Sequence, residues 1–326
     1  MVKPLFHSLI FEASGYVYTI RFKLVPLDSD VILPSFTSKL VKQLVLTQPC
    51  FSQVRALYES KVTLKPVTFK VLRRGSRRLY SSEGGPILTA RVGEVLGGEI
   101  AVFSRKPDLD LGLLSECNTR VSLPPLTSSF LLEVVEATLE NVNAMTLDLG
   151  QTQFLGVRLH TPTLLSTKLM TPPHLRASKL VERIEDLHRL AVTPAYICNE
   201  ATKLWLALAK DINPAQSPTP YHLGRACDIA IGEVDVQLKP ETVTYDREGE
   251  KTKRVRGVTG HILYKILTPR ITQVIDKTLA LTTKLGIGRS RSIGFGEIEV
   301  KQKYQRKLKT LHEPKLIYVT LRHRIH

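Results

Sequence analysis

The chain lacks several features that would place it outside the cell or in a membrane. Only four of its 326 residues are cysteines, Cys50, Cys117, Cys198 and Cys227, and no two form a Cys-x-x-Cys pair. Neither a structural zinc site nor a disulfide framework is therefore expected, and a reducing compartment fits this composition. The N-terminus has none of the regions of a signal peptide, and no apolar run approaches the roughly 18 residues of a membrane span. We expect a cytoplasmic protein with no membrane association.

Acidic residues are scarce, and one end of the chain carries nearly all of the resulting excess of positive charge. Lys and Arg number 46 against 30 Asp and Glu, for a formal net charge of +16. Residues 251–326 hold 18 of these cations and 4 of the acids, which leaves +14 in that region. A concentrated basic surface attracts polyanions because binding releases their counterions. Nucleic acid is the first candidate partner, and a solvated face of lysines is the alternative.

Signatures of common enzyme classes are also missing, but one glycine-rich segment stands out. The Gly-Lys-Ser/Thr of a P-loop does not occur, and neither a Ser-His-Asp arrangement nor a paired carboxylate site is evident. Residues 286–296 instead read Gly-Ile-Gly-Arg-Ser-Arg-Ser-Ile-Gly-Phe-Gly. Helical periodicity over 268–285 precedes the segment and strand alternation follows it at 298–300. A dinucleotide fingerprint runs from strand through loop to helix, so this loop is of another kind.

The composition of this segment predicts contact with a nucleic-acid backbone. Glycines permit positive φ and close approach of another backbone, and their amides are available to phosphate oxygens. The two arginines supply charge for phosphate, and the phenylalanine is positioned either to stack on a base or to pack under the loop. The candidate RNA-binding residues here are Gly286, Gly288, Arg289, Arg291, Gly294, Phe295 and Gly296.

Periodicity along the chain predicts an α+β protein whose two halves follow one plan. Each half is expected to run strand, helix, two strands, helix, strand, which is the ferredoxin-like βαββαβ pattern in tandem. The alternation of residues 229–238 changes parity near Gly232, as a β-bulge would cause. We expect strands at 16–24, 154–160, 229–238, 258–266 and 298–300, helices at 35–48, 108–117, within 178–212 and at 268–285, extended segments at 62–72, 87–92 and 99–104, and either strand or helix at 130–140.

A tandem ferredoxin-like chain that ends in helix, Gly-x-Gly-x5-Gly-x-Gly and strand resembles the RAMP superfamily of CRISPR-associated proteins. Within it, the chain is most similar to the endoribonucleases that cut the long CRISPR repeat transcript into guides. The resemblance covers about residues 16–304, with domains expected at 1–145 and 146–304 and a basic extension at 305–326. Besides the glycine loop, it is carried by Gly257-Val-Thr-Gly260, Thr161-Pro-Thr163 and Lys65-Pro-Val-Thr-Phe69.

The resemblance implies RNA cleavage without metal or cofactor. The ribose 2′-OH would attack the adjacent phosphorus and leave a 2′,3′-cyclic phosphate and a 5′-OH. This chemistry requires a base, stabilisation of the phosphorane and an acid. Relatives often use a histidine from the first helix, yet residues 34–48 contain no histidine and no tyrosine. Lys39, Lys42 and Lys65 resemble the lysine-based variant found in some archaeal relatives, and we predict that they are the catalytic residues of a slow enzyme.

Further contacts and partners also follow from the resemblance. Arg254 and Arg256 belong to a basic hairpin arm that would grip an RNA stem through its phosphates, and a solvated run of charge is the alternative. The expected partner is CRISPR repeat RNA, or the mature guide, with other CRISPR-associated subunits as further candidates and a monomer or homodimer as the assembly. A non-catalytic RAMP subunit that coats guide RNA is the main alternative, and an unrelated RNA-binding protein is another.

Overall fold

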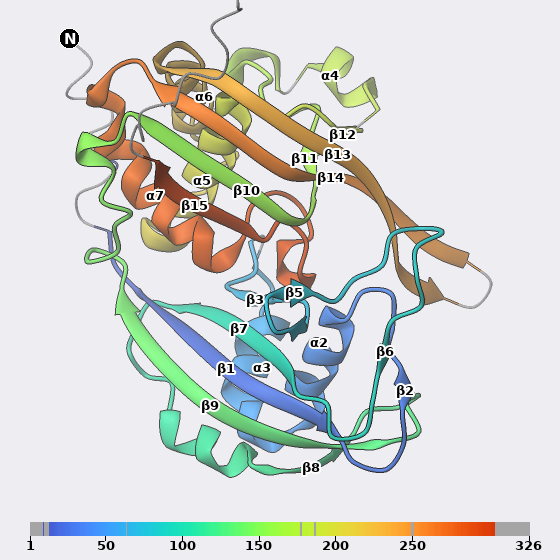
Figure 1. Cartoon of the computed structure of the whole chain (residues 1–326). Helices are drawn as coiled ribbons and strands as arrows, with labels where there is room; N and C mark the ends of the chain where they lie inside the picture. The colour runs from blue at the N-terminus through green and yellow to red at the C-terminus, as the bar shows by residue number, and fades with distance from the viewer. Residues whose placement is uncertain are drawn as a thin grey trace, which may run out of the picture.

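The structure is a computed structural model that describes residues 9, 13–62, 64–176, 178–185, 187–248 and 251–303. These residues form two units, each an antiparallel sheet with helices packed against one face (Figure 1). The chain is therefore α+β, as the sequence predicted. The expected basic extension at 305–326 lies outside the described residues.

The first sheet is built around β1 (Tyr16–Pro26), which pairs antiparallel with β7 (Leu96–Ser104) and β9 (Ser129–Asn141). From Ile20 onward its side chains alternate as predicted, because Ile20 and Phe22 are buried and the intervening Arg21 is exposed, whereas Thr19, expected among the polar positions, is also buried. The segment 130–140, which the sequence left as strand or helix, is part of β9. The sheet order is β5-β4-β7-β1-β9-β8 with β3 beside β7, where β3 is Val67–Phe69, β4 Arg73–Arg74, β5 Arg77–Arg78 and β8 Thr119–Ser122.

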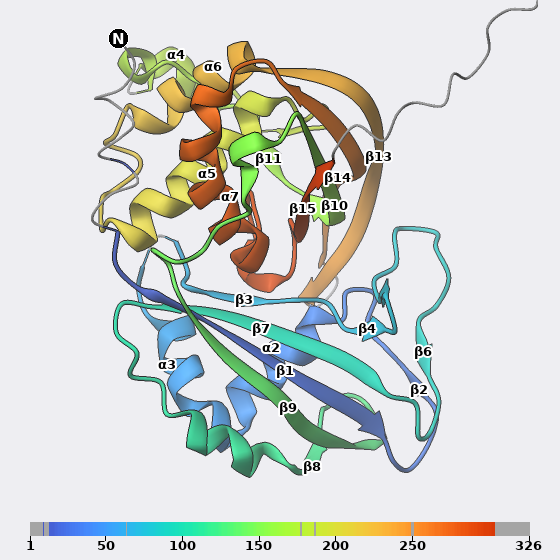
Figure 2. The ribbon, with the colours of Figure 1, turned by 60° about the vertical axis from the view of Figure 1, so that its left-hand side comes forward.

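Two helices cover one face of this sheet (Figure 2). The predicted first helix is present as α2 (Ser38–Thr47), and its apolar stripe from Leu40 to Val45 is buried in the core. A second helix, α3 (Ser52–Glu59), follows after one 3-10 turn and was not predicted. It buries only Val54 fully, so the apolar period in the sequence is too weak to reveal it.

The second sheet is built around β10 (Phe154–Thr163), with the order β13-β14-β10-β15. The hairpin of β13 and β14 is long, and its register shifts between Glu233 and Asp235, which confirms the predicted bulge. Three helices cover one face, of which α6 was not predicted. The bounds are β13 Ile231–Glu248, β14 Lys251–Ile266, β15 Ile298–Lys303, α5 Pro194–Ala209, α6 Thr219–Ala230 and α7 Thr272–Leu285.

Short elements complete the described chain. They include two small strand pairs, β2–β6 and β11–β12. The segment 108–117, which was expected to be a helix, contains the 3-10 helix η2. No helix in the described ranges is long and apolar enough to cross a membrane. The bounds are β2 Val31–Ile32, β6 Thr89–Ala90, β11 Leu165–Ser166, β12 His188–Arg189, α4 Lys179–Arg183, η1 Pro49–Phe51, η2 Leu111–Cys117, η3 Leu149–Gln151, η4 Pro173–Leu175, η5 Pro269–Ile271 and η6 Arg291–Ile293.

The cysteines depart from the sequence-based expectation. Cys50 is bonded to Cys117, and Cys198 is bonded to Cys227, so none of the four is free. The partners are 67 and 29 residues apart in the chain, a spacing that carries no motif. Folding brings η1 beside η2 and α5 beside α6, and only this packing reveals the pairs.

Candidate functional site

The glycine-rich segment is a tightly folded connection between α7 and β15. Its four glycines all have positive φ, from +67° to +95°. A Cβ at Gly296 would lie 1.8 Å from the carbonyl oxygen of Ile287, and one at Gly288 would lie 2.6 Å from that of Leu164. Only glycine fits such contacts, so these residues are explained by backbone packing inside the protein.

The amides of this segment are mostly used inside the protein. Gly286 N donates to Thr282 O and Gly296 N donates to Pro162 O, at 2.8 and 3.1 Å. Gly294 N donates to Arg291 O at 3.0 Å. The prediction that these three glycine amides face RNA phosphates is therefore corrected, because each already has a carbonyl partner.

Phe295 and Arg291 are also placed in the interior rather than on an RNA-facing surface. Phe295 is fully buried and stacks on Phe36, with ring centroids 4.3 Å apart. Of the two alternatives for this ring, packing under the loop is therefore correct. Arg291 is 5% exposed, and its guanidinium donates to the carbonyl oxygen of Lys65 and, at 3.3 Å, to Thr68 Oγ1. Its predicted contact with phosphate is corrected accordingly.

The segment also holds the two units together. Phe295, from the second unit, lies in an apolar cluster with Phe36 and Val71 from the first. Beside this cluster Glu297 accepts hydrogen bonds from Arg73 at 2.7 Å and from Arg78 at 2.8 Å. Burial raises the pKa of Glu297, but the hydrogen bond from Arg78 and nearby positive charges outweigh it, so the pKa is lowered. We call this arrangement of Arg73, Arg78 and Glu297 the clamp on Glu297. The sequence analysis missed it because the two arginines are more than 200 residues from Glu297 in the chain.

Three predicted RNA-binding arginines do lie at the surface. Arg289 is exposed at the tip of the glycine-rich segment, and its amide donates to Leu164 O. Arg254 and Arg256 are exposed on β14. Arg254 forms an ion pair with Glu83 at 3.0 Å, which ties the hairpin to the first unit.

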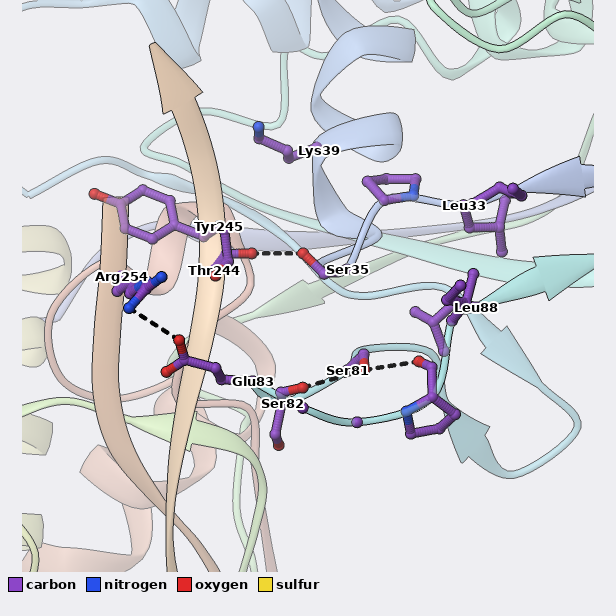
Figure 3. A pocket seen from close by; sticks show the side chains of 16 residues that line it. Leu33, Ser35, Lys39, Ser81, Ser82, Glu83, Leu88, Thr244, Tyr245 and Arg254 are labelled. Carbon is purple, nitrogen blue, oxygen red and sulfur yellow. Dashed lines mark hydrogen bonds and ion pairs between the residues drawn. The ribbon is translucent and has the colours of Figure 1, made fainter. Parts of the chain in front are cut away.

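A groove of about 680 Å³ opens where this hairpin meets the first unit. Figure 3 shows Lys39 extending from α2 over one end and the Arg254–Glu83 ion pair at another. Ser35 Oγ donates to Thr244 O at 2.6 Å across the junction. The walls of the groove combine aliphatic side chains, hydroxyl groups and cations. The lining residues include Ile32, Leu33, Ser35, Lys39, Ser81, Ile87, Thr244, Tyr245 and Arg254.

The other two predicted catalytic lysines meet over one aromatic ring. Lys42 Nζ lies 5.4 Å and Lys65 Nζ lies 5.8 Å from the ring centroid of Tyr58. Both distances are within cation–π range, so both ammonium groups contact the same ring. All three residues are partly exposed, which leaves the pair accessible to an anion. We call Lys42, Tyr58 and Lys65 the lysine–tyrosine cluster.

The glycine-rich segment and the start of α2 are in direct contact, which places the cluster beside the second unit. Ser38 Oγ donates to Ile293 O at 2.6 Å, and Lys42 lies one helical turn further along α2. Tyr58 was missed by the sequence analysis because it lies on α3, a helix that was not expected. Among the described residues, no group of three or more His, Cys, Asp or Glu side chains is arranged to hold a metal ion.

Comparisons with known proteins add a family context to this geometry. Residues 18–138 match the family described as Cas6 N-terminal domain, and residues 157–298 match CRISPR-associated endoribonuclease Cas6. Two proteins of Saccharolobus solfataricus, named CRISPR-associated endoribonuclease Cas6 1 and Cas6 2, are 26% and 28% identical over 291 and 290 residues. Each alignment covers 87% of this chain and 96% of the relative.

A solved structure shows the same fold. A Cas6 product complex superposes with a TM-score of 0.53 at 16% sequence identity, over 88% of this chain and 99% of that chain. At this identity the likeness concerns the fold, including its two antiparallel-sheet units.

Proposed function

This chain belongs to the Cas6 family of CRISPR-associated endoribonucleases, and on that premise we propose that it binds CRISPR repeat RNA and cuts the precursor transcript at the lysine–tyrosine cluster. The observation that carries the proposal is that two family matches follow each other in chain order over 18–138 and 157–298. The domain boundary proposed at residues 145 and 146 falls between them, with a first domain of 1–145 and a second of 146–304.

Each unit is assigned as a ferredoxin-like domain on its strand order. In the second sheet the order is β15-β10-β14-β13, so the first strand in the chain lies between the fourth and the third. The order β9-β1-β7 with β3 beside β7 repeats this arrangement in the first sheet. This is the strand order of the βαββαβ motif.

The reaction is transesterification without metal. The 2′-OH gives up its proton to solvent water as it attacks the adjacent phosphorus, the bond to the 5′ oxygen breaks, and the products are a 2′,3′-cyclic phosphate and a 5′-OH. Lys42 and Lys65 supply two positive charges for the phosphorane oxygens and an ammonium proton for the leaving 5′ oxygen. Tyr58 positions both ammonium groups through its ring, and the interaction with each contributes about 0.5–2 kcal/mol.

RNA binding is assigned to the exposed cations around the cluster. Lys39 was predicted from the sequence to be catalytic, and we reassign it to binding because it lines the groove. Together with Arg254 and Arg256 on the hairpin and Arg289 at the loop tip, it provides positive charge along the junction of the two units. Their contacts with phosphate would fix the register of the RNA. The four glycines of the loop contribute by shaping the junction and not by binding RNA directly.

Cleavage of repeat RNA in EDTA tests the function. The wild-type protein should cut unmodified RNA and leave RNA with a 2′-deoxy group at the cut site intact. Lys42→Ala and Lys65→Ala should each lower the single-turnover rate by about 10² or more, with smaller effects on the dissociation constant. Lys179→Ala, an exposed lysine on α4, is the matched control and should cleave normally.

The same assay distinguishes the main alternative, which the absence of a histidine in the first helix favours. A RAMP subunit that only coats guide RNA, alone or with other CRISPR-associated subunits, would bind repeat RNA tightly and cleave neither substrate. Equal loss of binding and cleavage in the lysine variants would move Lys42 and Lys65 to a binding role.

A further inference from the structure

Arg291 is a charged side chain in the interior whose hydrogen bonds go to two backbone carbonyls and one hydroxyl group. Its guanidinium donates to Lys65 O, to Leu285 O at 3.5 Å and to Thr68 Oγ1 at 3.3 Å. Burial lowers the pKa of Arg291 to about 10, partly opposed by the charge of Glu200. The group therefore remains charged at neutral pH, although removing a charge from water is costly.

These contacts join three parts of the molecule. Leu285 ends α7, Lys65 precedes β3 and Thr68 lies within it, and Arg291 lies in the glycine-rich segment that follows α7. Thr68 Oγ1 also donates to Leu285 O at 2.8 Å. The backbone of Lys65 is thus held by the second unit, while its ammonium group reaches Tyr58 in the first.

A second contact limits the position of the Lys65 side chain. Lys65 Nζ donates to Ser60 O, beyond the end of α3. With its carbonyl held by Arg291 and its ammonium by Ser60 and Tyr58, the lysine is constrained at both ends. A misplacement of about 1 Å at a catalytic group can lower a rate by about 10², so such a constraint bears on catalysis.

We propose that Arg291 is a positioning residue, which holds the backbone of Lys65 so that its ammonium group stays over Tyr58 in the lysine–tyrosine cluster. This inference rests on the proposed function, since it assumes that Lys65 acts on the scissile phosphate. It assigns the buried arginine of the glycine-rich segment to the alignment of the cutting site across the two units, in place of contact with RNA.

A double-mutant cycle on the full-length protein tests the proposal. Arg291→Met should lower the single-turnover cleavage rate by about 10 to 100 times while the dissociation constant for RNA changes less than about threefold. In a Lys65→Ala background the same substitution should have almost no further effect, because the group it positions is gone. Arg291→Lys, which retains a donor, should restore part of the rate.

Two further variants make the result decisive. Arg289→Ala, at the exposed tip of the same segment, should instead weaken binding with little change in the bound cleavage rate. If Arg291→Met does not fold, Thr68→Val removes one partner of the guanidinium and should slow cleavage several-fold, again only when Lys65 is present.

The outcomes separate the two proposals. If the wild-type protein binds but does not cleave, the proposed function fails before Arg291 is tested. If the wild type cleaves and the losses from Arg291→Met and Lys65→Ala multiply independently, or if Arg291→Met acts mainly on the dissociation constant, the positioning role is wrong.

Discussion

The clamp on Glu297 makes a quantitative prediction about how the two units are joined. Its side chain is 4% exposed and accepts hydrogen bonds from Arg73 at 2.7 Å and from Arg78 at 2.8 Å. Hydrogen bonds to charged groups contribute about 1.5–3 kcal/mol each. The side chains of Arg73 and Arg78 are 28% and 19% exposed, so water compensates part of the loss. Glu297→Gln should therefore lower the free energy of unfolding by about 3 kcal/mol at neutral pH.

The pH dependence of this difference follows from the lowered pKa of Glu297. Such a carboxylate stabilises the fold fully above its unfolded pKa of 4.5, and the contribution is lost as pH falls through the lower folded pKa. The difference in free energy of unfolding between wild type and Glu297→Gln should be constant above about pH 5 and shrink below pH 4.5. Urea unfolding from pH 7 to pH 3 measures it.

A neighbouring carboxylate serves as the control. Glu299 is 37% exposed and bonds His160 at 3.1 Å on the open face of the second sheet. Glu299→Gln should lower the free energy of unfolding by less than about 1 kcal/mol. A Glu297→Gln variant as stable as wild type, or a difference that does not decrease in acid, would refute the clamp as a stabilising contact.

Three other measurements test separate parts of the structure. Burial raises the pKa of Glu99, but Lys70 and the nearby arginines outweigh it and lower the pKa from 4.5 to about 2. This shift corresponds to about 3 kcal/mol of stability. The free energy of unfolding of Glu99→Gln should be lower than that of wild type by this amount above pH 4.5, and the two should converge near pH 2. Gly296→Ala should cost more than about 2 kcal/mol, because its Cβ would collide with the carbonyl of Ile287, whereas Gly150→Ala meets nothing within 4 Å and should unfold at nearly the wild-type temperature. Affinity for repeat RNA should fall with salt at a log–log slope of about −0.7 per phosphate neutralised, and a flat response in filter binding would contradict the charge argument.

The sequence by itself determined the features that depend on local pattern and composition. Alternation over residues 16–24 predicted β1 because a half-buried strand has a period of two. The parity change near Gly232 predicted the bulge in β13 for the same reason. The excess of positive charge in residues 251–326 follows from counting Lys, Arg, Asp and Glu in the sequence. The family resemblance depended on the spacing of four glycines between a helix and a strand.

Only the tertiary structure decided what those residues touch. Sequence placed Arg289 and Arg291 in one turn and treated them alike, yet the first is exposed and the second is buried against Lys65. The ring of Tyr58 between two lysines and the clamp on Glu297 join segments whose separation in the chain carries no signal. Local periodicity reports which face of an element is covered, whereas these contacts are set by which elements pack together.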